Sequence, residues 1–388
     1  MKIQEILEIM AYNAEPTQHY ESAKKWKEAT GGKVVGIEPM HFPAEIYHAA
    51  SALPVLLQEG PEAVTLGHSY MLTYYCGYSR SLADSAAKGD LDFMDAFIIG
   101  RGASSVQGLC VQDVFLQLFP DKLVDTTEII EFMDDPWSKE RVIKTFTMLK
   151  EHVESLTGVT VTKEKLLSSI RLYNRGRELM RELYQLRRDG NDTLNPVQMQ
   201  NIIKASMVMP KEEHNSLLEQ LVPLVKATPK SKRSGKIPVY LSGHLCHIVK
   251  PDILRLIVEN GGVVVDDDLY TGWRYIFNTV KENNENPIEA LADDYFDKNK
   301  ILPCPTRVDP HTNWNLTLLD NVRKSGAKGL IILQVKYCEP HMFNYPDIKD
   351  TFEKTNIPHL LLETEHEVIS MESLRTRIES FMEKINIS

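Results

Sequence analysis

The sequence lacks closely spaced cysteine pairs. Its five cysteines form no C-x-x-C motif and stand at widely separated positions: Cys76, Cys110, Cys246, Cys304 and Cys338. This spacing excludes a zinc ribbon and a ferredoxin-type cluster motif, since both take ligands from such pairs. Disulfide bonds are also not expected, because the number of cysteines is odd and the chain has no secretory features. Any metal site must therefore collect its ligands from distant parts of the chain.

The sequence also lacks an excess of basic over acidic residues, and it lacks long apolar runs. Its 388 residues carry a formal net charge of −10, whereas nucleic-acid binding needs a basic face that neutralises phosphates. No stretch approaches the roughly 20 apolar residues of a membrane span. The N-terminal residues 1–15 mix glutamate with apolar residues at helical spacing, unlike a signal peptide. We therefore expect a cytoplasmic protein that binds neither nucleic acid nor membranes.

What is present is a repeated pattern of short apolar runs, each followed by a loop and an amphipathic stretch. The chain is 43% hydrophobic and 25% charged, which is typical of a globular protein. Strand-loop-helix units in series predict parallel sheets of the α/β class. We predict strands within residues 33–37, 92–99, 237–243, 263–268, 329–338 and 357–365.

The middle of the chain has a different pattern. Residues 138–156 and 163–189 place apolar side chains at three- and four-residue spacing, which predicts amphipathic helices. Thr162 is a suitable N-cap for the second helix. The sequence thus predicts three domains: an N-terminal α/β lobe (1–135), a helical region (136–230) and a C-terminal α/β lobe (231–388).

Three cysteines lie at or near predicted strand ends, where ligands bind in open parallel sheets. Cys338 ends the predicted strand 329–338, Cys110 follows the loop after strand 92–99, and Cys76 lies in an aromatic, glycine-containing segment. Two thiolates from one lobe and one from the other could hold a cubane cluster in the cleft between them. Buried cysteines also serve as small core residues, so the residues alone leave both interpretations open.

A set of phrases occurs in fixed order from about residue 33 to 385: IEPMHFPAEIYHAASALPV, YYCGYSRS, GLCVQD, YNRGREL, DDDLYTGWR, ALADDYF, LPCP, KYCEPHMFNYPDIKD and LRTRIESF. In these phrases the sequence resembles the benzoyl-CoA reductase and 2-hydroxyacyl-CoA dehydratase family. The resemblance implies two flavodoxin-like parallel-sheet lobes with helices. It also implies a 4Fe–4S cluster between the lobes, with Cys76, Cys110 and Cys338 as ligands.

The resemblance also implies a function. The phrase KYCEPHMFNYPDIKD and the chain length favour the ATP-dependent benzoyl-CoA reductase branch, which reduces the aromatic ring of benzoyl-CoA to a cyclic diene. The implied partners are a homologous second substrate-site subunit, iron–sulfur ATPase subunits as electron donor, ferredoxin upstream, and an aromatic CoA thioester. The sequence has no G-x-x-x-x-G-K-[ST] loop, in keeping with ATP hydrolysis on a partner. Two alternatives remain: a 2-hydroxyacyl-CoA dehydratase subunit, or a non-catalytic electron-relay or scaffold subunit.

Other residues near these motifs are candidates for proton transfer. Glu45 follows Pro43 at a predicted strand-to-helix junction and could transfer protons, or could simply favour the first turn of a helix. His41 could donate a proton or hold a thioester carbonyl. For Cys304, between two prolines, we expect a structural turn. For residues 266–268, three consecutive aspartates, we expect an exposed acidic turn at a strand end.

Overall fold

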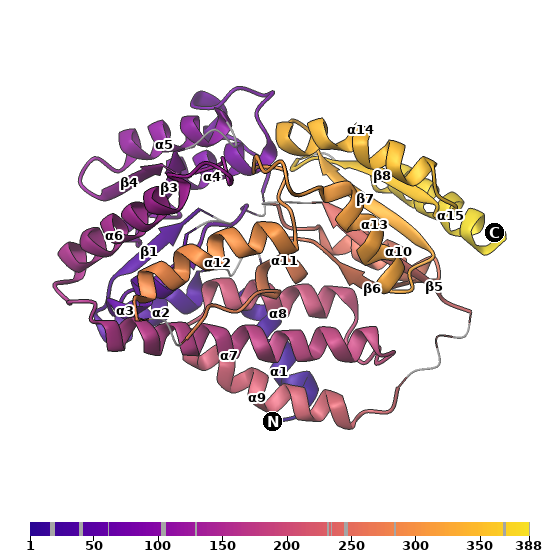
Figure 1. The fold of residues 1–388 in the computed structure, drawn as a ribbon, viewed down its shortest axis with the longest axis horizontal. Coiled ribbons are helices and arrows are strands. Elements are labelled where there is room, and N and C mark those ends of the chain that lie inside the picture. The colour runs from indigo at the N-terminus through magenta and orange to yellow at the C-terminus, as the bar shows by residue number, and fades with distance from the viewer. Residues whose placement is uncertain are drawn as a thin grey trace.

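The structure is a computed structural model with two sheets of parallel strands, which lie side by side (Figure 1). It describes residues 1–15, 20–38, 42–60, 62–101, 106–128, 130–230, 233, 235–243, 247–282, 285–367 and 370–387. None of its helices combines the length and the apolar composition that crossing a lipid bilayer would require, within these described residues.

The N-terminal sheet has the strand order β2-β1-β3-β4 and the C-terminal sheet has the order β6-β5-β7-β8. All neighbouring strands within each sheet are parallel. Two α/β lobes with parallel sheets confirm the predicted fold class. The strands are β1 (Val34–Ile37), β2 (Leu53–Leu56), β3 (Ala96–Arg101), β4 (Leu123–Glu128), β5 (Ile237–Gly243), β6 (Gly262–Asp267), β7 (Gly329–Val335) and β8 (His359–Thr364).

Helices cover the sheets and form a layer alongside both of them. In Figure 1, α7, α8 and α9 run beneath the two lobes, while α4 and α5 lie over the N-terminal sheet and α13 and α14 over the C-terminal one. The helices are α1 (Ile3–Ala14), α2 (Glu21–Thr30), α3 (Ala44–Ala49), η1 (Leu66–Ser69, 3₁₀), α4 (Gly77–Lys88), α5 (Val106–Leu118), α6 (Ser138–Thr157), α7 (Lys163–Arg188), α8 (Pro196–Val208), α9 (Lys211–Ala227), α10 (Pro251–Glu259), α11 (Trp273–Ile276), α12 (Pro287–Ile301), α13 (Trp314–Lys324), α14 (Glu339–Glu353) and α15 (Met371–Ile387).

Local sequence explains where several of these elements begin and end. Every residue of β1, β2, β6 and β7 is buried, as expected for parallel strands that are covered on both faces. The predicted cap is confirmed, since the Thr162 side chain accepts a hydrogen bond from the Lys165 amide at the start of α7. One boundary was wrong: β7 stops at Val335, and Cys338 instead occupies the N-cap position of α14.

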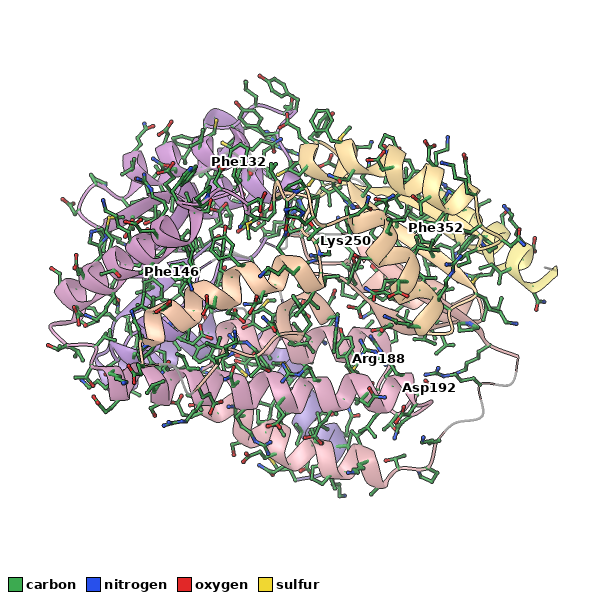
Figure 2. All side chains as sticks on the ribbon, viewed as in Figure 1. Phe132, Phe146, Arg188, Asp192, Lys250 and Phe352 are labelled. Atoms are coloured by element: carbon green, nitrogen blue, oxygen red, sulfur yellow. The ribbon has the colours of Figure 1, made fainter. Side chains whose placement is uncertain are left out.

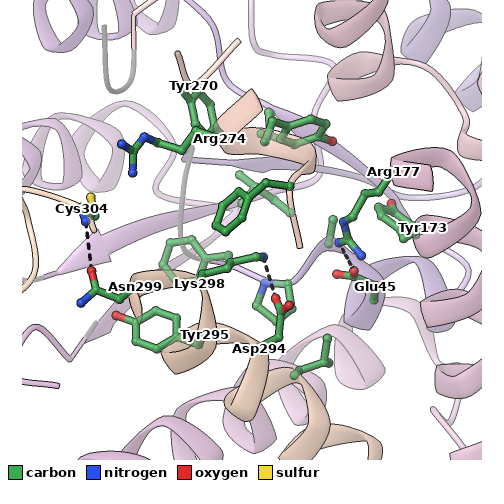
Figure 3. A pocket seen from close by; sticks show the side chains of 18 of the residues that line it. Glu45, Tyr173, Arg177, Tyr270, Arg274, Asp294, Tyr295, Lys298, Asn299 and Cys304 are labelled. Atoms are coloured by element: carbon green, nitrogen blue, oxygen red, sulfur yellow. Dashed lines mark hydrogen bonds and ion pairs between the residues drawn. The ribbon is translucent and has the colours of Figure 1, made fainter. Parts of the chain in front are cut away.

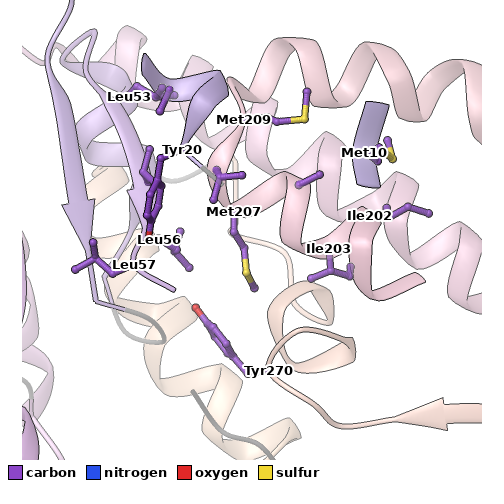
Figure 4. Close-up of a cluster of buried hydrophobic side chains, with 14 of the residues drawn as sticks. Met10, Tyr20, Leu53, Leu56, Leu57, Ile202, Ile203, Met207, Met209 and Tyr270 are labelled. Atoms are coloured by element: carbon purple, nitrogen blue, oxygen red, sulfur yellow. The ribbon is translucent and has the colours of Figure 1, made fainter. Parts of the chain in front are cut away.

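Residues from distant elements share one core. Figure 4 shows Met10 of α1, Leu53 of β2 and Ile203 of α8 among the side chains of the largest buried cluster. In Figure 2, Phe146 lies in the N-terminal half and Phe352 in the C-terminal half, and each belongs to a separate buried cluster. Helix α1 packs on α8, and α12 packs on α6, so there are contacts across both predicted domain boundaries, at 135 and at 230. The division into three domains remains a prediction.

Helix α7 is joined to both lobes by buried charges. Arg177 bonds Glu45 of α3 in the N-terminal lobe, and Glu45 is only 2% exposed. Further along the helix, Arg187 pairs with Asp267 at the end of β6, at 2.8 Å. Asp267 also accepts from the Tyr184 hydroxyl at 2.9 Å. Each carboxylate thus fixes one part of α7 to one lobe.

The expectation of an exposed acidic turn at residues 266–268 was wrong. Asp266, Asp267 and Asp268 are 7%, 4% and 1% exposed. Arg188 bonds Asp266 at 2.7 Å and Arg274 bonds Asp268 at 3.2 Å. Burial is possible because each carboxylate has a guanidinium from another element to neutralise it.

We predict that Asp267→Ala lowers the free energy of unfolding by about 3–5 kcal/mol, because the change removes the only carboxylate that is hydrogen-bonded to the buried Arg187 guanidinium among the described residues and leaves it Asp266 at 3.8 Å. Urea unfolding measures the loss. The matched control is Asp320→Ala, which removes an exposed carboxylate paired with Lys324 at 2.5 Å and should cost less than about 1 kcal/mol. Equal losses in the two variants would show that this pair does not anchor α7.

Candidate functional site

A pocket opens between the N-terminal sheet, α7 and α12. It encloses about 1050 Å³, including the part open to solvent. Its walls come from the end of β1, the start of α3, the middle of α7, residues 270–277, α12 and residues 302–307. Figure 3 shows Glu45, Arg177, Tyr270, Lys298 and Cys304 around this space. The pocket therefore collects side chains from both lobes and from the helical layer.

The pocket walls are rich in aromatic rings. A flat apolar group could pack against them, because ring faces and edges favour stacked or edge-on neighbours. Polar groups sit among the rings, as in most small-molecule sites. The aromatic residues are Phe42, Phe146, Tyr173, Tyr270, Tyr275, Phe277 and Tyr295.

Most of the basic groups of the pocket already have acidic partners. Arg177 bonds Glu45, and Lys298 pairs with Asp294 at 2.6 Å. Arg307 lies close to the Tyr295 ring, with its guanidinium 4.9 Å from the ring centroid. Burial raises the pKa of Glu131, and the Arg307 charge opposes this shift. The Arg307 Nη2 is fully buried and has no hydrogen-bond partner among the described residues, so this nitrogen is closed off from the pocket space.

Glu38 is the pocket carboxyl best suited to hold a proton. It follows the last residue of β1 and accepts a hydrogen bond from the Gly100 amide at 2.7 Å. Burial raises its pKa from 4.5 to about 7, although the Gly100 bond opposes the shift. Sequence reasoning missed Glu38. The sequence feature that could have identified Glu38 is its position directly after a buried parallel strand, where functional side chains gather.

Glu45 also lines the pocket, but as a carboxylate. Burial alone would raise its pKa, yet the adjacent Arg177 charge outweighs this effect and holds the pKa below its ordinary value. An ionised, paired carboxylate suits binding or orientation better than proton donation. The catalytic role of Glu45 stays a prediction. His41, the other predicted proton donor, lies outside the described residues.

Two of the predicted ligand cysteines begin helices, and a side-chain amide connects them. Cys76 is the N-cap of α4 and Cys338 is the N-cap of α14. The Gln107 side chain in α5 accepts from the Cys76 amide at 2.5 Å and donates to the Tyr337 carbonyl at 2.8 Å. Gln107 thus joins the segment of Cys76 to the residue before Cys338, across the two lobes.

Cys110 lies one turn after Gln107 in α5. Its thiol donates to the Tyr75 hydroxyl at 3.4 Å, and Tyr75 directly precedes Cys76. The elements that carry the three predicted ligands therefore lie next to one another, although their positions in the chain are far apart.

The thiols of Cys76 and Cys338 have opposite electrostatic surroundings. Burial would raise the pKa of Cys76, but a hydrogen bond from His247 and its positive charge lower the pKa overall. Burial, followed by the charge of Cys76, raises the pKa of Cys338 to about 12.

These side chains fit a 4Fe–4S cluster in ligand type, and hydrogen bonds of Gln107 and Tyr75 connect the segments that carry them. Within the part of the chain that the structure describes, no three His, Cys, Asp or Glu side chains form a group that could hold a single metal ion. A cubane is wider than one ion, so its ligands lie farther apart. The three cysteines as cluster ligands remain a prediction.

Cys304 lies in the pocket wall, between two prolines as the sequence shows. Its sulfur is 3.0 Å from the Thr306 hydroxyl, and its amide donates to Asn299 at 3.0 Å. The expected turn is confirmed, because the Arg307 amide donates to the Cys304 carbonyl at 2.9 Å. The charge of Cys304 also contributes to the raised pKa of Cys338. Sequence reasoning did not foresee that Cys304 lines the pocket.

Comparison with known proteins identifies the family. Residues 39–385 match the family described as 2-hydroxyglutaryl-CoA dehydratase, D-component. The chain belongs to this family. This confirms the resemblance found in the sequence.

Three curated relatives cover almost the whole chain. The chain is 26% identical to the (R)-phenyllactyl-CoA dehydratase beta subunit of Clostridium sporogenes, covering 93% of the chain and 94% of the relative. It is 25% identical to the beta subunit of lactoyl-CoA dehydratase of Anaerotignum propionicum, with the same coverage of 93% and 94%. It is 24% identical to a benzoyl-CoA reductase subunit of Thauera aromatica, with 95% of each chain covered.

These relatives are two dehydratase subunits and one reductase subunit, and their sequence identities to the chain are nearly equal. All three are named as subunits of enzymes that act on CoA thioesters. The similarity therefore supports an enzyme-related role for this family member. It does not favour the reductase branch that the sequence phrases suggested.

We predict that Glu38→Gln removes a pH-dependent loss of stability. Because the pKa of Glu38 is raised from 4.5 to about 7, the folded state keeps a proton in this range that the unfolded state has released. The unfolding free energy of the wild type should therefore fall as pH rises through this range. Relative to the wild type, the Gln variant should gain stability over the same range, and the gain should level off above about pH 7.

Urea unfolding at a series of pH values checks this expectation. Glu372→Gln, at an exposed position in α15, controls for the loss of a negative charge. A gain in the Glu38→Gln variant that does not change with pH would contradict the assignment of a neutral Glu38 carboxyl below about pH 7.

Proposed function

We propose that the chain is an iron–sulfur subunit of a benzoyl-CoA reductase, in which Cys76, Cys110 and Cys338 hold a 4Fe–4S cluster beside the aromatic pocket. The observation that carries the proposal is the Gln107 bridge. It brings the segments of Cys76 and Cys338 together across the two lobes. The phenyl ring of an aromatic CoA thioester fits the chemistry of the pocket walls.

When bound, the cluster would supply single electrons at low potential. The side chains of the pocket would do the rest. Tyr173 and Tyr275 would pack against the ring and exclude water. Glu38, held by the Gly100 amide, would keep a proton on a carboxyl oxygen near neutral pH and release it to the ring.

The proposed net reaction adds a pair of electrons and a pair of protons to the ring and yields a cyclic diene. The partners in this proposal are a homologous substrate-site subunit, iron–sulfur ATPase subunits that donate the electrons, and ferredoxin upstream of them. Relatives named as subunits support the need for a partner.

The second candidate is a 2-hydroxyacyl-CoA dehydratase subunit. The relative named (R)-phenyllactyl-CoA dehydratase favours it specifically, because a phenyllactyl group also carries a phenyl ring that suits an aromatic pocket. In this lyase the electron is recycled and water is lost, so the net electron demand separates the two reactions.

We expect the chain, purified without oxygen, to contain iron and to show the EPR signal of a reduced cluster. Cys76→Ser, Cys110→Ser and Cys338→Ser should each lose most of the iron, because serine is a poor ligand for a cluster built on thiolates. Cys304→Ser is the matched control: it replaces a nearby thiol by the same hydroxyl and should keep the iron. Wild-type iron in all three ligand variants would refute the assignment.

The reaction is tested by counting electrons with the assembled complex, its ATPase component and a strong reductant. For the reductase we expect benzoyl-CoA to disappear with a pair of electrons consumed per product. Loss of water from (R)-phenyllactyl-CoA with only a catalytic amount of electrons would assign the lyase function instead. No turnover of either thioester would remove both enzyme assignments.

A further inference from the structure

The turn between β7 and α14 contains a residue with an uncommon backbone conformation. The Cys338 amide donates to the Val335 carbonyl at 3.2 Å, which closes a turn over residues 335–338. Of the two central residues of this turn, Tyr337 has a φ of +65° and Lys336 does not have a positive φ. This order of signs is that of a type II turn, in which the third residue is usually glycine. Tyr337 therefore occupies a position that favours glycine.

Packing of the tyrosine ring does not explain this conformation. A side chain at positive φ brings its Cβ close to the following carbonyl oxygen, and this costs free energy. Tyr20 also has a positive φ, of 75°, but it is 3% exposed and its hydroxyl accepts from the Gln58 amide at 2.8 Å. Tyr337 is 41% exposed, so its ring is not enclosed in this way. Its conformation is held through the backbone instead.

Gln107 holds this backbone from the other lobe. Its side chain is 4% exposed, and its Nε2 donates to the Tyr337 carbonyl at 2.8 Å. Its Oε1 accepts from the Cys76 amide at 2.5 Å, which orients the amide group so that its N–H is directed at the turn. A buried hydrogen bond is costly to leave unmade, so the bond to the turn offsets the strain at Tyr337. Because Gln107 belongs to α5 and the turn follows β7, the strain is offset only while the two lobes are together.

The last residue of the turn is a predicted cluster ligand. Cys338 is the N-cap of α14, and its carbonyl accepts from the Met342 amide at 3.0 Å. If Tyr337 changed to a negative φ, the chain would leave the turn in another direction, and Cys338 would move with it. We propose that Gln107 is a positioning residue, which keeps the turn in its strained conformation and thereby fixes Cys338 relative to the segment of Cys76. The inference rests on the proposed function only for the role of Cys338 as a ligand.

The test combines two measurements on the full chain, purified without oxygen: amide hydrogen exchange over residues 329–345, and the rate at which a chelator removes iron. Gln107→Leu removes both hydrogen bonds at a similar side-chain volume. We expect exchange in the turn and loss of iron to become about fivefold faster, which is the scale of one lost hydrogen bond. Gln107→Glu keeps the acceptor for the Cys76 amide but loses the donor to Tyr337, so it should have the same effects.

Substitutions at Tyr337 distinguish positioning from a general weakening of the contact between the lobes. Glycine adopts a positive φ without strain, so Tyr337→Gly added to Gln107→Leu should restore slow exchange and slow loss of iron. Tyr337→Ala also removes the ring but keeps the Cβ, so it should not restore them.

A second buried glutamine provides the matched control. Gln200 in α8 donates to the Val249 carbonyl at 2.8 Å and accepts from the Thr271 hydroxyl at 3.2 Å, so it also connects two distant segments. Neither partner belongs to a segment that carries a predicted ligand. Gln200→Leu should therefore leave both the exchange in the turn and the loss of iron unchanged.

The outcomes separate this inference from the proposed function. A wild-type chain without iron overturns the cluster, and exchange in the turn then decides by itself whether Gln107 holds Tyr337. The inference alone is overturned by wild-type exchange in Gln107→Leu, by unchanged loss of iron in a chain that contains iron, or by a glycine rescue no better than the alanine one. If Gln107→Leu does not fold, Gln107→Glu with and without Tyr337→Gly decides by the same criteria.

Discussion

The structure depends on charges that are buried along a single helix. Helix α7 bonds Glu45 through Arg177 near its middle and Asp267 through Arg187 near its end. Ionised groups lose their water on burial, so each needs an opposite charge in the right place. These pairs fix the helix to both lobes, and the helix contributes Tyr173 and Arg177 to the pocket wall. The relative position of the lobes and the shape of the pocket thus follow from the same pairs.

The pocket and the thiols are connected through two residues. Glu38 faces the pocket, and its Oε1 would lie 3.7 Å from a Cβ placed on Gly108, which lies just before Cys110 along α5. Cys304 lines the pocket and influences Cys338 electrostatically. Glu38 thus connects the pocket wall to the helix that carries Cys110.

Polar groups from both lobes meet around Cys76. Glu59 Oε1, after β2, lies 3.0 Å from His247 Nδ1, after β5, and Arg80 in α4 bonds Glu365 after β8 at 2.6 Å. Lys250, which Figure 2 shows between the lobes, donates to the His366 carbonyl at 2.5 Å. Such contacts are directional, so they fix the position of one lobe relative to the other more narrowly than apolar packing alone.

The sequence alone determined the two parallel sheets, the helical layer and the family. Apolar β-branched runs of strand length and amphipathic helical stretches are local patterns, and local patterns can be read in order along a chain. Strand β2 was missed because Leu53–Leu56 is a four-residue run that contains Pro54. Strand β4 was missed because only its first two residues are apolar and the four that follow are polar.

Only the tertiary structure decided which distant side chains meet. The three aspartates at 266–268 look exposed in sequence, yet arginines from α7 and from residue 274 allow them to be buried. Glu38 and His247 carry no local motif. Their chemistry comes from burial and from partners contributed by β3 and by Glu59. Protonation and hydrogen bonding depend on neighbours in space, and a linear sequence does not contain that information in local form.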